Sequence, residues 1–381
     1  MNFSSSLSWF FFSVALLSAF LLTVFMSLVS KEEKADVPGE KLELRYSSLL
    51  GIIEGDGYTV VDISNPWDGS IMHRYVLVPK TEELPALLPE GTLLRTPVSN
   101  MLVFSGVHVA LLEELGSAAC VKAVCDAEYI YSEMTASAIS KGDVVDCGSS
   151  MNVDLERVAE VSPEAILVLP YENGGYGKLG RSGVPLVECA DYMESSPLGC
   201  AEWVRFYGRL VGKAEIADSI FNAVRHDYEA LSVMASNVTV RPKLLCELMG
   251  SSAWYLPAGE STMGRIYSDA GADYIFSYTA GTGSVPLSFE TVLEKASDAD
   301  VWLVKYNSPV DKTYTSLLAE HGGYIHFRPF EERNIYVCNT KYRRIFEERS
   351  FHPEILLKEL VALFHPELFP EYKLKYYERM R

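Results

Sequence analysis

The chain of 381 residues is poor in basic residues and lacks several patterns that would define a chemistry. It has 33 Lys and Arg against 51 Asp and Glu, a formal net charge of −18. This balance argues against a nucleic-acid-binding role, because few cations are available to neutralise phosphates. The motifs GxSxG and GxxxxGK[ST] are absent, so neither a nucleophile elbow nor a phosphate loop is predicted. The glycine-rich stretch NGGYGKLG (173–180) follows a strand without phosphate-loop spacing and is predicted to be a loop.

Cysteine and histidine patterns that would indicate a metal site or a disulfide framework are also missing. The seven cysteines include no CxxC pair, and their odd number leaves at least one free thiol. Most lie in apolar stretches, where Cys is usually a small buried hydrophobe. His73, His108, His321 and His326 show neither HxxH nor HExxH spacing, so each is predicted to be a core or surface histidine.

Charge is absent from one long run near the amino terminus. Residues 7–29, LSWFFFSVALLSAFLLTVFMSLV, are long and apolar enough to span a membrane, and KEEK follows at once. Two interpretations remain open: an export signal cleaved near Ser27–Ser30, and a retained membrane anchor. Lys and Arg are missing ahead of the run, which is atypical of a signal. No Cys lies near its end, so a lipoprotein attachment is not predicted. Either interpretation predicts an exported, periplasmic protein, with anchoring to the inner membrane left open.

The remaining sequence predicts an α/β fold with more than one core, since 381 residues exceed one ordinary domain. Strand and helix patterns alternate on both sides of a stretch of about forty residues without strand signal, which predicts parallel sheets with helices on both faces. Ser195 or Ser196 is a predicted N-cap in that stretch, with Pro197 at the first helical position, and apolar residues from Ile216 to Leu231 predict a helix of about twenty residues. The predicted segments are a signal or anchor (1–30), a linker (31–45), an amino-terminal lobe (46–195), a helical linker with the long helix (196–236), and a carboxyl-terminal lobe ending in helices (237–381).

One pattern occurs twice, once in each predicted lobe. MNVDLERVAEVSPEAILVLP (151–170) and VPLSFETVLEKASDADVWLV (285–304) both combine a helix with a following apolar strand. Asp154 and Ser288 are predicted helix N-caps, which places Glu156 and Glu290 in the first helical turns. The helix dipole favours a carboxylate there by about 0.3–1 kcal/mol, which explains either Glu alone. As a pair, they fit two exposed acids that dock onto a twofold-symmetric partner and set its orientation.

The order and spacing of several segments resemble a known family. The markers are VSNMLVFSGVHVALLEELG, GSSMNVDLERVAEVSPEAILVL, SPLGCAEWVRFYGRLVGKAEIADSIFNAVRHDY, WYLPAGESTMGRIYSDAGADYIF, SFETVLEKASDADVWLV and FHPEILLKELVALFHPELF. Over roughly residues 90–369 the chain resembles the substrate-binding proteins of bacterial ABC importers for iron–siderophores, haem and vitamin B12. The segment 42–91 is an addition, similar to the form common in Bacteroides-type bacteria, and the lipoprotein Cys of many relatives is missing.

The resemblance implies two three-layer α/β lobes with mostly parallel sheets, joined by one long helix, and a monomeric receptor without catalytic activity or resident cofactor. It implies an ABC permease dimer as partner, docked through Glu156 and Glu290. The implied ligand is a ferric siderophore or haem-like iron complex, with a corrinoid as the alternative. A metal-cluster or chelatase-like enzyme of related two-lobed fold, and a membrane-anchored ligand sensor, are the rival functions.

Ligands of open α/β sheets bind beyond the carboxyl ends of the strands, and aromatic side chains with polar tips suit a large, partly apolar ligand. Polar and aromatic residues that follow the predicted strands are therefore candidates to line a cleft between the lobes: Ser99, Asn100, Tyr129, Tyr131, Ser149, Ser150, Tyr171, Asn173, Trp254, Tyr255, Tyr278 and Tyr306. Arg343 and Arg344 could meet an anionic ligand. Glu347 and Glu348 stand beside them, which favours a solvated charged surface instead.

Overall fold

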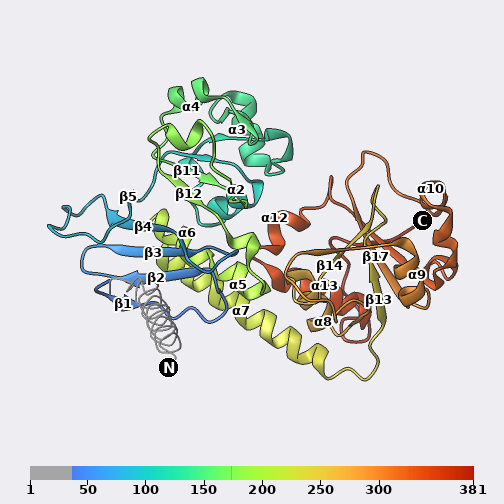
Figure 1. The fold of residues 1–381 in the computed structure, drawn as a ribbon. Coiled ribbons are helices and arrows are strands. Elements are labelled where there is room, and N and C mark those ends of the chain that lie inside the picture. Colours follow the sequence, from blue (N-terminus) through green and yellow to red (C-terminus); the bar gives the residue numbers. More distant parts are fainter. Residues whose placement is uncertain (1–36, 173) are drawn as a thin grey trace, which may run out of the picture. The chain divides into compact units, whose positions relative to one another are not determined.

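The structure, a computed structural model, describes residues 37–172 and 174–381. Residues 40–381 form one compact unit, drawn as the coloured ribbon of Figure 1. The predicted signal or anchor (1–30) lies outside the described residues. Within the described part of the chain, no helix combines the length and apolarity needed to cross a membrane.

The unit begins with a five-stranded sheet built mainly from the segment that the sequence analysis identified as an addition, residues 42–91. Its strands lie in chain order and are antiparallel except for the last pair: β1 (Glu40–Lys41), β2 (Leu50–Glu54), β3 (Thr59–Ser64), β4 (Ile71–Pro79) and β5 (Thr92–Thr96). Two predictions need correction. The linker expected over 31–45 contains β1, because Glu40 and Lys41 pair with β2. Residues 92–96, which the predicted bounds place in the amino-terminal lobe (46–195), form β5 and belong to this first sheet, because β5 pairs in parallel with β4.

The amino-terminal lobe has a parallel sheet in the order β12-β11-β6-β7-β8. Its strands, helices and a small hairpin (β9, β10) are β6 (Met101–Val103), α2 (Gly106–Glu114), β7 (Val121–Val124), α3 (Glu133–Lys141), β8 (Val145–Asp146), β9 (Gly148–Ser149), β10 (Asn152–Val153), α4 (Leu155–Val161), β11 (Ala165–Val168) and β12 (Leu186–Glu188). Successive side chains along a strand point to opposite faces of the sheet. Met101 and Val103 accordingly join one buried cluster and Leu102 joins another, so this sheet is packed on both faces, as predicted.

The first sheet protects an exposed edge of this lobe. Strand β12 is the edge strand, and Tyr75 of β4 lies against it. The Tyr75 hydroxyl donates to the Leu186 carbonyl and accepts from the Glu188 backbone N–H, each at 2.9 Å. One side chain thus occupies backbone groups that would otherwise be free to pair with another chain.

Helices occupy the segment between the lobes, as predicted: α5 (Pro197–Glu202), α6 (Val204–Leu210) and α7 (Ala214–Ser236). The Ser196 side chain caps α5 by accepting from the Gly199 N–H at 3.2 Å. Helix α7 has 23 residues, and its buried stripe includes Phe221, Tyr228 and Leu231. At 1.5 Å per residue it is about 34 Å long, which confirms the predicted long helix.

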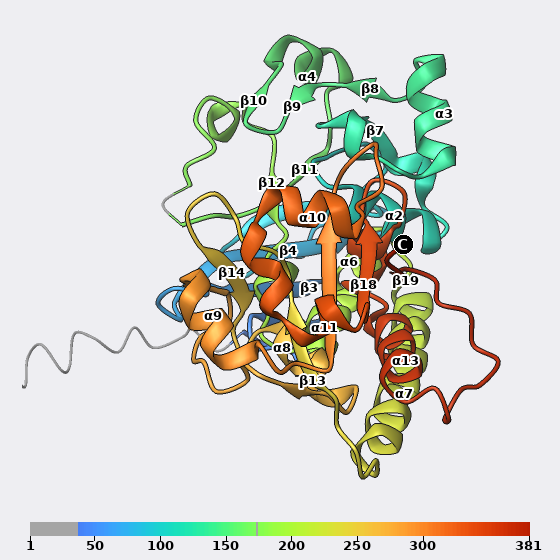
Figure 2. The same cartoon turned by 90° about the vertical axis from the view of Figure 1, so that its right-hand side faces the viewer.

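The carboxyl-terminal lobe has a second sheet, in the order β15-β13-β17-β18-β19, parallel except for β19. Its elements are β13 (Lys243–Cys246), β14 (Trp254–Pro257), α8 (Thr262–Asp269), β15 (Asp273–Tyr274), β16 (Ser284–Leu287), α9 (Phe289–Ala296), β17 (Val301–Tyr306), α10 (Tyr314–Glu320), α11 (Arg328–Glu331), β18 (Ile335–Asn339), α12 (Ile345–Arg349), α13 (Pro353–Phe364) and β19 (Glu378–Arg379). Figure 2 shows β18 and β19, the last two strands of this sheet, next to each other. Strands β14 and β16 pair with each other and form a separate two-stranded antiparallel sheet.

The repeated pattern has the same structural outcome in both lobes. Helix α4 leads into β11, which pairs in parallel with β6, the first strand of its sheet. Helix α9 leads into β17, which pairs in parallel with β13, again the first strand of its sheet. Asp154 and Ser288 cap the two helices by accepting backbone N–H bonds, as predicted. The duplication is therefore architectural.

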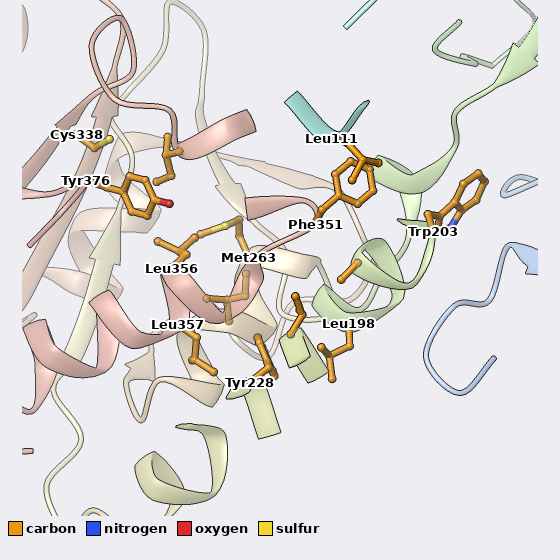
Figure 3. Close-up of a cluster of buried hydrophobic side chains, with 14 of the residues drawn as sticks. Leu111, Leu198, Trp203, Tyr228, Met263, Cys338, Phe351, Leu356, Leu357 and Tyr376 are labelled. Atoms are coloured by element: carbon orange, nitrogen blue, oxygen red, sulfur yellow. The ribbon is translucent and has the colours of Figure 1, made fainter. Parts of the chain in front are cut away.

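Apolar side chains run without interruption from the first lobe through the linking helices into the second. Figure 3 shows this junction, where Leu111 of α2 and Phe351 lie near Trp203, and Met263 lies near Leu356 of α13. All five are buried. Because bending the lobes apart would expose this surface, large hinge motion is disfavoured.

Candidate ligand-binding site

The carboxyl edges of the two sheets face each other. Tyr131, which follows the carboxyl end of β7, has a backbone N–H that donates to Glu347 Oε1 of α12 at 3.3 Å. The guanidinium of Arg344, which follows the carboxyl end of β18, donates to the Tyr131 carbonyl. Residues beyond the carboxyl ends of both sheets are therefore in contact, and this is the edge at which open α/β sheets bind ligands.

A cavity of about 790 Å³ opens at the carboxyl edge of the amino-terminal lobe. It lies beyond the ends of β6 and β11, and the turn before α4 forms one side. Aliphatic and aromatic side chains dominate its lining, with a few polar groups: Phe104, Ser150, Met151, Asn152, Val153, Asp154, Leu155, Glu156, Leu169, Pro170, Tyr171, Tyr176, Gly177, Lys178, Leu179 and Tyr192. This volume and composition suit a small molecule with a large apolar part.

One wall of the cavity is held by an aspartate in the left-handed backbone conformation. Asp126, with φ of 50°, follows strand β7 by two residues. Its carboxylate accepts from the Ser150 N–H at 3.2 Å and from the Ser150 hydroxyl. The Asp154 carboxylate accepts from the Glu156 and Arg157 N–H groups at 3.1 and 3.2 Å. These bonds order the turn that carries Ser150 into the cavity wall.

The opposite wall comes from the glycine-rich loop. Tyr176 packs edge-on against Tyr171 at 6.4 Å between ring centroids. Its hydroxyl donates to Glu188 Oε1 at 3.2 Å. Burial, reinforced by the charge of Glu188, raises the pKa of Tyr176, so the phenol stays protonated and serves as a hydrogen-bond donor. The sequence predicted a loop here, but nothing in the local pattern marked it as a cavity wall.

The structure places the amino-lobe candidates in three groups. Ser150 and Tyr171 line the cavity, whereas Ser149 and Tyr129 are exposed nearby, after β8 and β7. Tyr131 contributes its backbone to the contact between the lobes. Asn173 lies outside the described residues.

Ser99 and Asn100 lie at the other edge of the sheet, because they precede β6. The Ser99 N–H donates to Glu164 at 2.9 Å. The Asn100 amide donates to the Val161 carbonyl at the end of α4, also at 2.9 Å. The premise that they follow a strand of the lobe was wrong, since β5 belongs to the first sheet.

Two of the carboxyl-lobe candidates, Trp254 and Tyr306, lie in the interior of the lobe. Trp254 is fully buried, and its indole N–H donates to the Cys246 carbonyl at 3.0 Å. It packs against Trp302, with ring centroids 5.6 Å apart. Tyr306 is also buried, and its hydroxyl accepts from the Lys312 N–H at 3.1 Å. Both are therefore placed as packing residues.

Tyr255 and Tyr278 remain exposed. Tyr255 lies in β14, which follows the carboxyl end of β13. The ammonium group of Lys295 lies 5.4 Å from the ring centroid of Tyr278, a cation–π contact that holds this ring against α9.

Glu156 and Glu290 are both exposed, each in the first turn of its helix. Each helix leads into a parallel strand and so runs opposite to it, which brings the helix start to the carboxyl edge of the sheet. Glu156 lies at this edge, since it lines the cavity that opens there. Hydrogen bonds from its own backbone N–H and from Ser288 lower the pKa of Glu290, so it is ionised at neutral pH. The two acids therefore occupy equivalent, solvent-accessible positions on the two lobes.

A second contact joins the lobes at the two ends of α2. Glu347 lies beside Gly106 at the start of this helix, where the dipole favours a carboxylate. At its other end, Glu114 accepts from His352 Nε2 at 2.8 Å, while Glu354 accepts from His352 Nδ1 at 2.9 Å. Burial opposes protonation of His352, but the two carboxylates outweigh it and raise the pKa to about 10.

The cysteines lie in the interior, as their apolar surroundings in the sequence predicted. All seven cysteines are buried, and none forms a disulfide within the described residues. His108 is buried and lies 2.9 Å from Asp191 Oδ1 and 3.1 Å from the Tyr207 hydroxyl. In the described part of the chain, no group of three His, Cys, Asp or Glu residues is arranged to hold a metal ion.

Two lobes with facing carboxyl edges, one long connecting helix and a cavity at the edge define a two-lobed solute-binding protein. The family model described as periplasmic binding protein matches residues 107–342, so the chain belongs to that family. Its members are binding proteins.

The chain is also similar to several individual proteins. An uncharacterized lipoprotein of Methanocaldococcus jannaschii, MJ0878, is 24% identical over 361 residues, which cover 88% of this chain and 84% of the relative. A possible iron-binding (periplasmic solute-binding) protein of Staphylococcus epidermidis superposes with a TM-score of 0.57 at 14% identity, covering 71% of this chain and 100% of that one. The periplasmic vitamin B12 binding protein BtuF of Vibrio cholerae gives a TM-score of 0.52 at 12% identity, covering 72% of this chain and 99% of that one. At such identities the two structures show the shared fold alone.

Proposed function

We propose that the chain is the extracytoplasmic solute receptor of an ABC importer, which captures a ligand between its lobes and delivers it to a permease. The observation that carries this proposal is the cavity of about 790 Å³ at a carboxyl edge that faces the other lobe. The apolar run at residues 7–29 supports export, as a cleaved signal or as a retained anchor.

The ligand is an iron complex, either a siderophore or haem-like, with a corrinoid as the second choice. Aromatic and aliphatic side chains dominate the cavity lining, and the exposed rings of Tyr129 and Tyr255 add to the carboxyl edges. Rings of this kind bury large flat or macrocyclic ligands without leaving polar groups unpaired. The names of the similar solved proteins, one possibly iron-binding and one vitamin B12 binding, support the same two classes.

Docking to the permease uses Glu156 and Glu290. They are exposed, lie on helices of equivalent topology, and present one acid from each lobe. A permease dimer with one basic pocket per subunit matches such a pair, and charge complementarity of this kind sets orientation and encounter rate.

The test combines uptake with binding. In cells that depend on this receptor, the double variant Glu156→Arg/Glu290→Arg is expected to lose uptake of the ligand, because both contacts become repulsive. Because Glu156 also lines the cavity, ligand affinity is compared on the single variant Glu290→Arg, which is expected to bind the ligand with near-normal affinity in a fluorescence titration. Normal uptake by the double variant would contradict the docking role. Native mass spectrometry of protein isolated from its own cells, if it finds no bound solute under ligand-replete growth, would contradict the receptor function itself.

A further inference from the structure

An exposed basic segment follows strand β18 at the carboxyl edge of the second lobe. Its four residues, Lys341 to Arg344, are all solvent-exposed, although the whole chain carries a net charge of −18. The backbone that presents them is well anchored, because Asn339 Oδ1 accepts from the Lys341 N–H at 3.2 Å. The Asn339 carbonyl also accepts from the Arg343 N–H at 3.0 Å. The segment is therefore a fixed part of the edge.

The acids that follow this segment in sequence form no ion pair with Lys341 or Arg343 within the described residues; the segment residue that Glu347 pairs with is Arg344, at 3.8 Å. Glu347 is buried and accepts from the Tyr131 N–H at 3.3 Å. The Glu348 carboxylate accepts from Lys375 and from the Tyr376 hydroxyl. The sequence expectation that these two acids form a solvated charged surface with both arginines therefore needs correction. Glu348 is held by Lys375 and Tyr376, and Glu347 is buried, with its carboxylate 3.8 Å from Arg344.

Other cations at this edge are already neutralised. Lys305 pairs with Glu247, and Lys312 pairs with Glu320. Arg344 donates to the Tyr131 carbonyl, so it serves the contact between the lobes. Within the described residues, the side chains of Lys341 and Arg343 have neither a hydrogen-bond partner nor an acidic partner.

We infer that Lys341 and Arg343 form an anion-binding subsite that selects a ligand carrying carboxylate or similar anionic oxygen groups. This inference rests on the proposed function and narrows its ligand class to an anionic iron chelate, in preference to a corrinoid. Arg recognises a carboxylate through two parallel hydrogen bonds, and Lys adds a compact charge. Tyr342 and Phe346, both exposed beside the pair, supply apolar area for the rest of the ligand.

The location also fits this role. Arg344 touches the amino-terminal lobe through Tyr131, so its neighbour Arg343 stands where the two carboxyl edges meet. Tyr129, two residues before Tyr131, is exposed at the same place. A ligand with anionic groups directed at the second lobe and an apolar body directed at the first would contact both edges.

The experiment measures binding of four probes to the full-length chain by quenching of its tryptophan fluorescence. The probes are a ferric citrate complex, haemin, haemin dimethyl ester and cyanocobalamin. The Lys341→Ala/Arg343→Ala variant tests the subsite. Its charge-matched control is Lys141→Ala/Arg241→Ala, because both control residues are exposed and lie at the amino edges of the two sheets.

We expect the wild-type protein to bind ferric citrate, haemin or both, and to bind haemin dimethyl ester at least about tenfold more weakly than haemin. The subsite variant should lose about tenfold in affinity for the anionic probe, whereas the control variant keeps wild-type affinity. The wild-type affinity should also fall more steeply with added salt than that of the subsite variant.

Five results would overturn the inference. Unchanged affinity of the subsite variant, or an equal loss in the control variant, means that these two residues do not select the ligand. Equal binding of haemin and its dimethyl ester, with no binding of ferric citrate, means that anionic groups are not recognised. Tight binding of cyanocobalamin alone rejects the anionic ligand class and leaves the receptor function standing. Binding of none of the four probes counts against both.

Discussion

The two lobes repeat one plan, yet their carboxyl edges are completed differently. In the amino-terminal lobe the edge is hollow, with a cavity walled by the loop around Tyr176. In the carboxyl-terminal lobe, aromatic rings pack against one another between β14, β17 and the segment before α11, among them Trp254, Trp302 and Tyr324. The comparison teaches that a duplicated topology sets where a site can form, whereas side-chain volume decides which copy is open.

The largest effect on stability is expected for one of two aromatic residues, Trp254 and Tyr171, that the sequence analysis proposed alike as candidates to line the cleft. Trp254→Ala removes a fully buried indole and is expected to lower the free energy of unfolding by about 3–5 kcal/mol. Tyr171→Ala changes an exposed ring and should alter stability by less than about 0.5 kcal/mol. Urea denaturation followed by circular dichroism measures both. A similar stability for the two variants would remove the contrast between a filled and a hollow edge.

The two sheets differ in how their edge strands are protected, which offers a second comparison. Strand β18 is covered by β19, and the buried Glu359 carboxylate holds the approaching chain by accepting from the N–H groups of Lys375, Tyr376 and Tyr377 at 2.7–3.0 Å. Glu359→Ala leaves these donors unpaired and should cost about 3 kcal/mol in the free energy of unfolding. Glu359→Gln retains one acceptor oxygen and is expected to cost less. Equal losses in the two variants, measured in urea, would contradict this hydrogen-bonding role.

The amino-terminal lobe protects its edge with a single hydroxyl, so a smaller loss is expected there. Tyr75→Phe keeps the buried ring and removes the group that pairs with Leu186 and Glu188. The expected cost is about 1–2 kcal/mol in the free energy of unfolding. Hydrogen exchange should also show faster exchange of the Glu188 amide. Unchanged protection of that amide would mean that Tyr75 does not shield the strand.

The smallest expected effect concerns the contact between the lobes and depends on pH. The folded-state pKa of His352, about 10, lies above its usual value near 6.5, so protonated His352 stabilises the fold. Its full contribution is present below pH 6.5 and is lost as pH rises toward 10. Because Glu114 is partly exposed, solvent screening limits the effect to about 1 kcal/mol.

His352→Gln removes the titrating group. It should therefore abolish the part of the decrease in the free energy of unfolding, from pH 6.5 toward pH 10, that comes from His352. The free energy of unfolding is measured at pH 6.5 and pH 9.5 for both proteins. The difference between variant and wild type should shrink at the higher pH. A difference that stays constant across this range would show that the charge on His352 does not contribute.

Much of the fold follows from local patterns. The long helix over 214–236, the caps at Asp154 and Ser288, and the repeated helix–strand unit were all predicted, because each depends on spacing within a few residues. Strand β5 was assigned to the wrong sheet, since its own sequence carries no information on which strand it pairs with. Strands β1 and β19 are two residues long and have no periodicity to detect.

The candidate site, like the fold, could be predicted from the sequence only in part. The positions of Ser150 and Tyr171 at the carboxyl edge, and the exposure of Glu156 and Glu290, were predicted by asking which residues follow strands or begin equivalent helices. The cavity wall at Tyr176 was not found, and the freedom of Arg343 from neighbouring acids was misjudged. Both depend on contacts with residues distant in sequence.

By itself, the sequence determined the alternation of elements, the duplication and the acidic character of the chain, because these are properties of short-range order and composition. Only the tertiary structure decided that Trp254 is interior while Tyr171 borders a cavity, and that Glu347 turns away from Arg343. The physical reason is that burial and charge pairing belong to the assembled neighbourhood of a side chain, which residues far along the chain supply.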